Sequence, residues 1–182
     1  GEILDTIDRG YGLQDNLVYS VFEDRRGNMW LGLATGIAKV EYDSPVSIYH
    51  QGSKLAKQVT FVMKHNERLY AGSTSGLFVF ESPFFEPTRL VHECWKMISF
   101  GGSYLAATSK GVFFVEKESM YNVLEGKTSS MLHSKYNPDL VWCGTFQELA
   151  TLTRVNGRWS VTHRFETDKQ SIRSIIEEQD GT

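Results

Sequence analysis

The sequence contains little cysteine, and this shortage argues against a zinc site built from thiolates. Its 182 residues include two cysteines, Cys94 and Cys143, which lie far apart and outside any CxxC or Cys/His cluster. A zinc site is therefore not supported. Each cysteine lies in an apolar, strand-like run, so we interpret both as small buried hydrophobic residues.

Long apolar runs and clusters of basic residues are also absent. No apolar stretch approaches the roughly 20 residues that a helix needs to cross a bilayer, so we expect no membrane contact by this segment. No run of lysine and arginine occurs, and nucleic acid is therefore not an expected partner. The remaining composition, with 41% hydrophobic and 23% charged residues and a net charge of −3, is ordinary for a globular protein.

An internal repeat organises the chain. The stretch GLATGIAKV at residues 32–40 recurs as GSTSGLFVF at 72–80, as AATSKGVFFV at 106–115 and more loosely as GTFQELATL at 144–152. The marker positions are Gly36, Gly76, Gly111 and, in the fourth copy, Glu148. Their spacing of about 35 to 40 residues is the period of propeller blades.

Each repeat contains segments that alternate apolar with small or polar residues, which is the period of a β-strand. A first strand is expected upstream of each marker, at residues 16–24, 58–66, 94–102 and 129–137, with a fifth copy at 170–181. A further strand is expected downstream, at residues 44–51, 88–93, 120–125 and 158–165. One column of the repeat, expected to be buried, holds Trp30, Tyr70, Leu105 and Trp142. Four strands per repeat is the number in a propeller blade.

The acidic and glycine-rich stretch EDRRGNMWLGLATG at residues 23–36 has three interpretations. It could cradle a phosphate, hold a calcium ion at Glu23 and Asp24, or form turns. No helix or Lys-Ser/Thr pair follows the glycines, as a phosphate-binding loop requires. We therefore favour turns, with Gly27 and Gly36 as turn glycines and Asp24 capping its own turn. No metal and no cofactor is expected.

These patterns predict an all-β fold. We expect a β-propeller of about four four-stranded antiparallel blades with split strands of adjoining blades, as a fragment of a larger propeller. Residues 1–9 would be the outer strand of a preceding blade, and 171–182 the start of a further blade, because a shift of the first repeat places Val18 on Ile172 and Glu23 on Glu177. Open strand edges would favour self-association. The complete blades are predicted at 16–50, 57–92, 94–124 and 129–165.

Catalytic patterns are missing. No serine lies in a G-x-S-x-G motif, and neighbouring carboxylates such as Glu177 and Glu178 point to opposite faces of a strand. The histidines show no i, i+2 or i, i+4 pairing, and we interpret them as surface or blade-edge residues. They are His50, His65, His92, His133 and His163. We therefore expect this segment not to be an enzyme.

The segment GLQDNLVYSVFEDRRGNMWLGLATGIAKV resembles the two-component regulator propeller repeat. The shared pattern is Gly12-Leu13, the Asn16 to Val18 stretch, Glu23-Asp24, the turn glycine Gly27, and then the strand Trp30 to Gly32 with Gly36-Ile37. SIRSIIEEQDG near residue 181 is a second strong match. The three blades between keep the strand columns but lose most of this signature.

The resemblance implies a ligand-sensing, extracytoplasmic (periplasmic) propeller segment of a two-component signalling regulator. It implies a saccharide or other small ligand, with the remaining blades of the parent propeller as partners. A histidine kinase and a transmembrane helix would lie outside this segment. A propeller that docks a protein as a scaffold is the alternative, and a propeller hydrolase or lyase is less favoured.

Ligand-binding candidates lie on the face formed by the loops that lead into the inner strands and those that join second to third strands. Trp95 could equally pack within its blade, and Lys110 could be a solvated turn residue. Because Gln147 precedes Glu148, where other repeats have glycine, we expect that turn to be unusual. The candidates are Tyr19, Gln58, Trp95, Lys110, Gln147 and Arg173.

Overall fold

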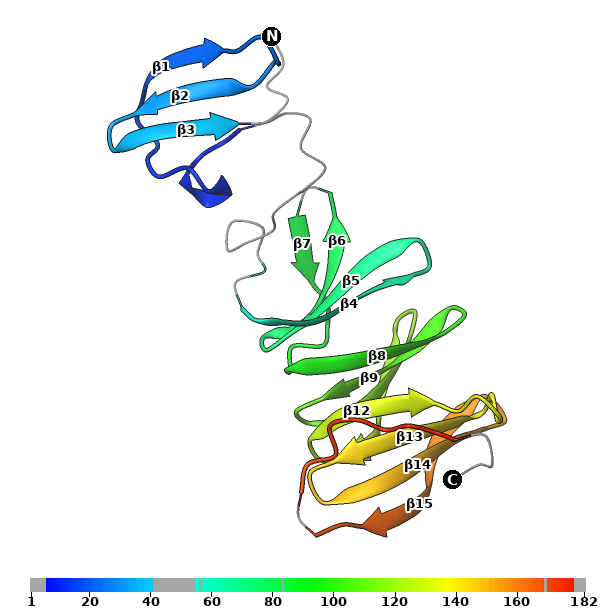
Figure 1. The fold of residues 1–182 in the computed structure, drawn as a ribbon. Coiled ribbons are helices and arrows are strands. Elements are labelled where there is room, and N and C mark those ends of the chain that lie inside the picture. The colour runs from blue at the N-terminus through cyan, green and yellow to red at the C-terminus, as the bar shows by residue number, and fades with distance from the viewer. Residues whose placement is uncertain (1–5, 41–54, 56, 83, 169, 179–182) are drawn as a thin grey trace. The chain divides into compact units, whose positions relative to one another are not determined.

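The computed structural model describes residues 6–40, 55, 57–82, 84–168 and 170–178 (Figure 1). The chain divides into two compact units, Gly1–Ala56 and Lys57–Thr182, which we describe separately. Within the described ranges no helix is long and apolar enough to cross a membrane. Apart from one short 3-10 helix, the regular structure of these ranges consists of β-strands.

The first unit contains one antiparallel sheet with the strand order β1-β2-β3. Its elements are the 3-10 helix η1 (Arg9–Tyr11) and the strands β1 (Val18–Glu23), β2 (Met29–Leu33) and β3 (Gly36–Val40). The fourth strand that we predicted at 44–51 lies outside the described residues. Residues 6–9, the described part of the predicted outer strand, form no strand, and Arg9 begins η1.

The second unit contains three four-stranded antiparallel sheets, in each of which consecutive strands are neighbours. The first consists of β4 (Val59–His65), β5 (Arg68–Ser73), β6 (Gly76–Glu81) and β7 (Phe84–Pro87). The second consists of β8 (Cys94–Phe100), β9 (Ser103–Thr108), β10 (Gly111–Glu116) and β11 (Ser119–Glu125). The third consists of β12 (Thr128–His133), β13 (Leu140–Thr145), β14 (Glu148–Val155) and β15 (Arg158–Glu166).

The outer strand β7 differs from our prediction, which placed it at residues 88–93. Phe85 is 3% exposed and pairs with Phe80 in β6, so the aromatic run before residue 88 forms the strand. Pro87 has no N–H to donate, and the ladder ends there. Leu77 then keeps contact with the following chain through its N–H, which donates to the Leu90 carbonyl at 2.9 Å.

The hydrophobic core of the second unit lies between successive sheets, which pack face to face. One cluster joins the first and second sheets and includes Leu77, Met97 and Ala106. The other joins the second and third sheets and includes Leu105 and Trp159. The middle sheet is therefore covered on both faces. Cys94 and Cys143 are fully buried, as predicted, and burial raises the pKa of the Cys94 thiol to about 12.

Two expectations about exposure are wrong. Tyr70 and Leu105 are buried, but Trp142 in the same column is only partly buried, and Trp30 is 40% exposed because no described sheet of its unit covers it. His65, which we interpreted as a surface or blade-edge residue, is 5% exposed. Its Nδ1 lies 2.6 Å from Ser99 Oγ, and burial lowers the pKa of the imidazole.

A β-bulge recurs near the start of each inner strand. The register shifts between Val18 and Ser20, and equivalent shifts occur in β4, β8 and β12. The extra residue in each strand has no pairing partner in the adjacent strand. Its side chain can therefore point in a direction that the regular alternation of the strand does not allow. These bulge residues are Tyr19, Thr60, Trp95 and Ser129.

Candidate functional site

The three turns that join second to third strands in the second unit share one hydrogen-bond arrangement. In the last sheet, Thr145 Oγ1 accepts the Gln147 N–H at 3.2 Å and donates to the Glu148 carbonyl at 3.0 Å. Ser73 and Thr108 hold the two preceding turns in the same way. Glu148 therefore occupies the glycine position while these two hydrogen bonds are kept. The turn still differs from the other two, because Gly76 and Gly111 have φ values of +139° and +134° whereas Glu148 has no positive φ, and its N–H also donates to Thr145 Oγ1 at 3.0 Å.

A cavity of about 670 Å³ lies beside this turn. The segment from Glu125 to Lys127 forms one wall, and the turn residues Phe146 and Gln147 contribute another part of the lining. Phe146 is 51% exposed. The charged lining groups are Glu125, Lys127, Glu148, Arg164 and Glu166. The cavity thus combines an aromatic ring, a side-chain amide and charges of both signs.

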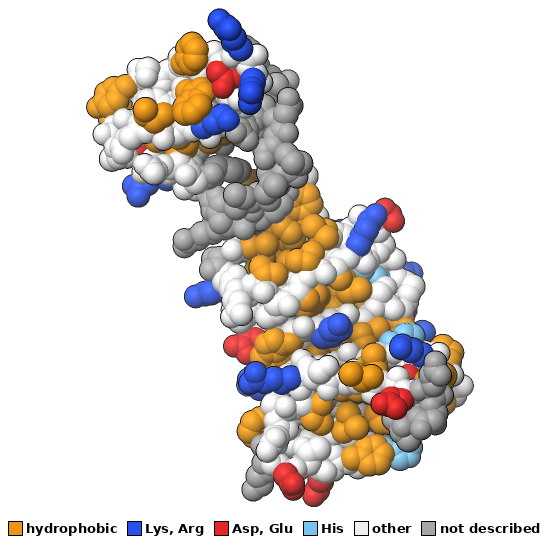
Figure 2. Space-filling model, in the orientation of Figure 1, with side chains coloured by type: hydrophobic (Ala, Val, Ile, Leu, Met, Phe, Trp, Pro, Cys, Tyr) orange, Lys and Arg blue, Asp and Glu red, His pale blue; other side chains and the backbone are white. Residues whose placement is uncertain are grey.

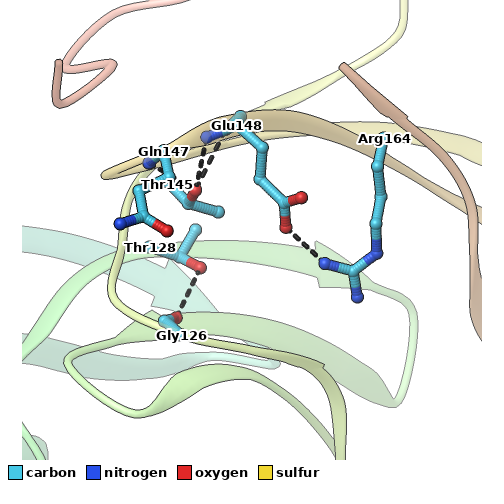
Figure 3. A network of polar contacts seen from close by, with 6 residues as sticks. All are labelled: Gly126, Thr128, Thr145, Gln147, Glu148 and Arg164. Atoms are coloured by element: carbon cyan, nitrogen blue, oxygen red, sulfur yellow. Dashed lines mark hydrogen bonds and ion pairs between the residues drawn. The ribbon is translucent and has the colours of Figure 1, made fainter. Parts of the chain in front are cut away.

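An ion pair between Glu148 and Arg164 crosses from β14 to β15 (Figure 3). The Arg164 side chain is 50% exposed, and a pair that is solvated to this extent contributes less than about 1 kcal/mol to stability. Figure 3 shows the two side chains directed toward one another beside Thr145 and Gln147. The pair therefore holds the guanidinium beside the cavity and adds little to the stability of the fold.

The bulge residue Trp95 is connected to the cavity through Lys127. The Lys127 Nζ lies 4.9 Å from the centre of the Trp95 ring, within the range of a cation–π contact. Trp95 is half-buried, so both interpretations of it, packing and recognition, agree with its position. The contact restrains the side chain of Lys127, which lines the cavity.

Residues 170–178 form no strand, but they are seated against the last sheet (Figure 1). The Ile172 N–H donates to the Thr145 carbonyl at 3.1 Å, and the Ser129 and Ser130 hydroxyls donate to the Ile172 carbonyl at 2.8 and 2.7 Å. Arg173, the next residue, is exposed. Thr145 therefore connects the turn at Gln147 with the segment that carries Arg173.

Glu177 fixes the far end of this segment. Its carboxylate accepts the Lys135 N–H at 2.7 Å, the Ser134 hydroxyl at 2.8 Å and the Trp142 indole N–H at 3.3 Å. These donors favour the ionised form, and the Lys135 N–H, the strongest of them, together with the other two holds the pKa of Glu177 below its ordinary value of 4.5.

Attachment of residues 170–178 should therefore depend on pH. Because the pKa of Glu177 is lowered in the folded state, its stabilising contribution is present above pH 4.5 and is lost as pH falls through the lowered value. We expect Trp142 fluorescence and amide exchange at Lys135 to report detachment in acid. In Glu177→Gln this acid transition should disappear, and an unchanged transition in that variant would contradict the assignment.

Asp24 caps its own hairpin, as predicted. Its Oδ1 accepts the backbone N–H groups of Arg26 and Asn28 at 2.8 and 3.1 Å, and its Oδ2 accepts the Trp30 indole N–H at 3.0 Å. The Asn28 side chain and then the indole hold the pKa of Asp24 far below its usual range. In the ranges that the structure describes, no three His, Cys, Asp or Glu side chains gather as a metal site.

The structure brings some of the predicted ligand-binding residues together and not others. Gln147 lines the cavity, Trp95 contacts its wall through Lys127, and Arg173 lies beyond Thr145. Gln58 and Lys110 are exposed and line no part of this cavity. Tyr19 is 73% exposed and belongs to the first unit. Their roles in binding stay predictions.

Sequence reasoning missed several residues of the cavity. Phe146 could have been noticed, because the equivalent turn positions in the two preceding sheets hold Thr74 and Ser109. Lys127 and Arg164 carried no such signal, since a cation in a linker or on an outer strand is usually solvated. Only the fold places them at one cavity.

The antiparallel four-stranded sheets that pack face to face are the blades of a β-propeller. The family model described as two component regulator propeller matches residues 12–34. This match confirms, over that segment, the resemblance to the two-component regulator propeller repeat.

Two solved structures from B. thetaiotaomicron are similar to the chain. One is the extracellular domain assigned to a hybrid two component system, with 19% identity and a TM-score of 0.68 over 99% of this chain and 27% of that one. Another extracellular domain, also assigned to a hybrid two component system, has 14% identity and a TM-score of 0.56 over 93% of this chain and 28% of that one. At this identity the likeness establishes the fold, and the chain spans about a quarter of either structure's length. A search of curated proteins found no match.

Proposed function

We propose that these residues are part of the extracytoplasmic, ligand-sensing propeller of a two-component signalling regulator. The regulator-type repeat at residues 12–34 carries this proposal. The similar structures are described as extracellular domains of two component systems, which supports both the sensing role and the location outside the membrane. The signalling output, such as a histidine kinase, would lie outside residues 1–182.

The cavity beside Gln147 is the site that we propose for the ligand. Its exposed Phe146 ring offers a platform for the apolar face of a sugar, while the Gln147 amide and the carboxylates of Glu125 and Glu166 offer partners for hydroxyl groups. A saccharide or another small polyhydroxylated molecule fits this chemistry best. No bond is made or broken in this role, and binding alone is the proposed activity.

Calorimetry with a panel of oligosaccharides on the full-length protein would test the site. We expect Gln147→Ala to weaken binding about fivefold, which corresponds to the loss of one hydrogen bond of about 1 kcal/mol. Phe146→Ala should weaken it further by removing the platform. Ser75→Ala changes the equivalent turn position of β5–β6 and should leave affinity unchanged.

Three outcomes would contradict the proposal. Equal affinity in the wild type and in Gln147→Ala and Phe146→Ala would place the ligand elsewhere. Absence of binding to every saccharide would exclude the ligand class. Turnover of a glycan by the pure protein would mean that the segment belongs to an enzyme. Separate measurements on Trp95→Ala and Arg173→Ala would show whether either of these residues, which do not line the cavity, also contributes to ligand affinity.

A further inference from the structure

A repeated contact joins successive inner strands of the second unit. In each case a residue at the end of one inner strand, or just after it, contacts the inner strand of the next repeat. The residue that it contacts lies one position earlier in the alignment of the repeats. His65 Nδ1 lies 2.6 Å from Ser99 Oγ, and the Phe100 and His133 rings are 4.9 Å apart. At the end of the described chain, Ser134 donates its hydroxyl to Glu177 at 2.8 Å.

A second contact recurs near the start of the inner strands, where a side-chain hydroxyl donates to a carbonyl of the next inner strand. The Thr60 hydroxyl donates to the Cys94 carbonyl, and the equivalent Ser129 hydroxyl donates to the Ile172 carbonyl at 2.8 Å. Residues 172–177 therefore occupy the place of an inner strand against the last sheet, although they have no strand neighbour of their own among the described residues. Glu177 is the inner-strand residue that contacts the preceding blade.

Glu23 is the equivalent of Glu177 in the first repeat. It lies in β1 opposite Met29, just before Asp24. Asp24 is fully engaged with its own hairpin, whereas Glu23 makes no hydrogen bond or ion pair with the described residues of the first unit. The two neighbouring carboxylates point to opposite sides of the strand and have different partners available.

The face of β1 that carries Glu23 is also uncovered. Side chains two residues apart share a strand face, so Val21 and Glu23 lie together. Val21 is 56% exposed, whereas the equivalent Met97 and Met131 are 3% and 5% exposed because a preceding blade covers them. Figure 2 shows hydrophobic side chains at the surface of the first unit. The first unit thus exposes the side that β8 and β12 bury, and the equivalent Val62 of β4, the first inner strand of the second unit, is likewise 59% exposed.

We propose that Glu23 and the β1 face dock onto the hairpin of a further propeller blade from outside residues 1–182. That hairpin would offer what Ser134, Lys135 and Trp142 offer to Glu177: a hydroxyl, a free backbone N–H and an indole N–H. The similar extracellular domains are several times longer than this chain, so their length accommodates such a blade.

A second copy of the chain is a poorer candidate for the partner that covers the Glu23 face of β1. The one hairpin of the described residues with this set of donors is already bound by Glu177. The Glu-Asp pair of the regulator-type repeat thus has two separate tasks, since the glutamate holds the neighbouring blade and the aspartate closes its own hairpin. This proposal does not depend on the ligand site.

Hydrogen exchange of the full-length protein, read by mass spectrometry, tests the docking. Glu23→Gln should accelerate exchange about tenfold in β1 and in one hairpin outside residues 1–182. The substitution weakens the charge-assisted hydrogen bonds that join the Glu23 carboxylate to that hairpin, so both segments open more often. Arg25→Gln, a charge change in the adjacent turn, should leave both segments as in the wild type. Unchanged exchange in β8 to β15 would show that the variant is folded.

The proposal is overturned if Glu23→Gln leaves β1 protected, or if faster exchange is confined to residues 6–40. The proposal is also overturned if exchange accelerates at Ser134 and Lys135 and not in a hairpin outside residues 1–182. That result would identify a second copy of the chain as the partner.

Discussion

Replacing Trp159 with alanine is expected to lower the free energy of unfolding of the second unit by about 3–5 kcal/mol, the usual cost of removing a buried aromatic side chain. Trp159 is 2% exposed, and its ring centre lies 4.8 Å from that of Phe100. Its backbone N–H donates to the Tyr121 hydroxyl of the neighbouring sheet at 3.1 Å. The side chain therefore fills the core between two blades.

Urea denaturation of Trp159→Ala and Trp159→Phe separates packing from polar contributions. The indole N–H is buried without an acceptor among the described residues, so phenylalanine loses ring volume but no hydrogen bond. We expect Trp159→Phe to cost less than half as much as the alanine change. Equal losses in the two variants would show that ring packing is not the source of the effect.

Replacing Gly111 with alanine should cost on the order of 3 kcal/mol. Its φ of +134° is rarely adopted by residues with a side chain, and an added Cβ would lie 2.0 Å from the Leu124 carbonyl oxygen. Either β10 or β11 must move to relieve this clash, which weakens their ladder.

Gly101→Ala is the matched control, because Gly101 also has a positive φ but an added Cβ would meet no atom within 4 Å. That change should cost only about 1 kcal/mol, the backbone penalty alone. Thermal melting of the two variants gives the comparison. A smaller loss at Gly111 than at Gly101 would mean that the close approach of β11 is absent in solution.

The repeat period and the alternation of side chains were sufficient to predict every strand of the three sheets of the second unit except β7, because both patterns are local. β11 and β15 contain the outer strands expected at 120–125 and 158–165. β7 was misplaced because two adjacent apolar stretches competed, and the position of Pro87 decides between them only once the pairing with β6 is known. The bulges left no pattern in the sequence that we could read.

Burial and the cavity were harder to predict, because both depend on neighbours far away in the sequence. Trp30 has the residue type of a core position, yet its exposure is decided by whether another blade covers it. Gln147 was found from an interruption in the repeat, whereas Arg164 becomes visible only through its pair with Glu148. An interrupted repeat is thus a usable signal, and an isolated outward-facing cation is not.

The packing of Ile172 against the last sheet determines where such a chain can be cut into modules. If Gly144 carried a Cβ, that atom would lie 2.7 Å from the Cβ of Ile172, so the last blade is shaped around a residue that belongs to the next repeat. In a solenoid-like array, each unit is stabilised mainly by its nearest neighbour. A cut after Glu166 would separate the last blade from its cover and expose Gly144 and Trp142, whereas a cut after Glu178 keeps them together. The natural module boundary for recombining such repeats therefore falls inside a blade, after the inner strand, and not in the linker between sheets.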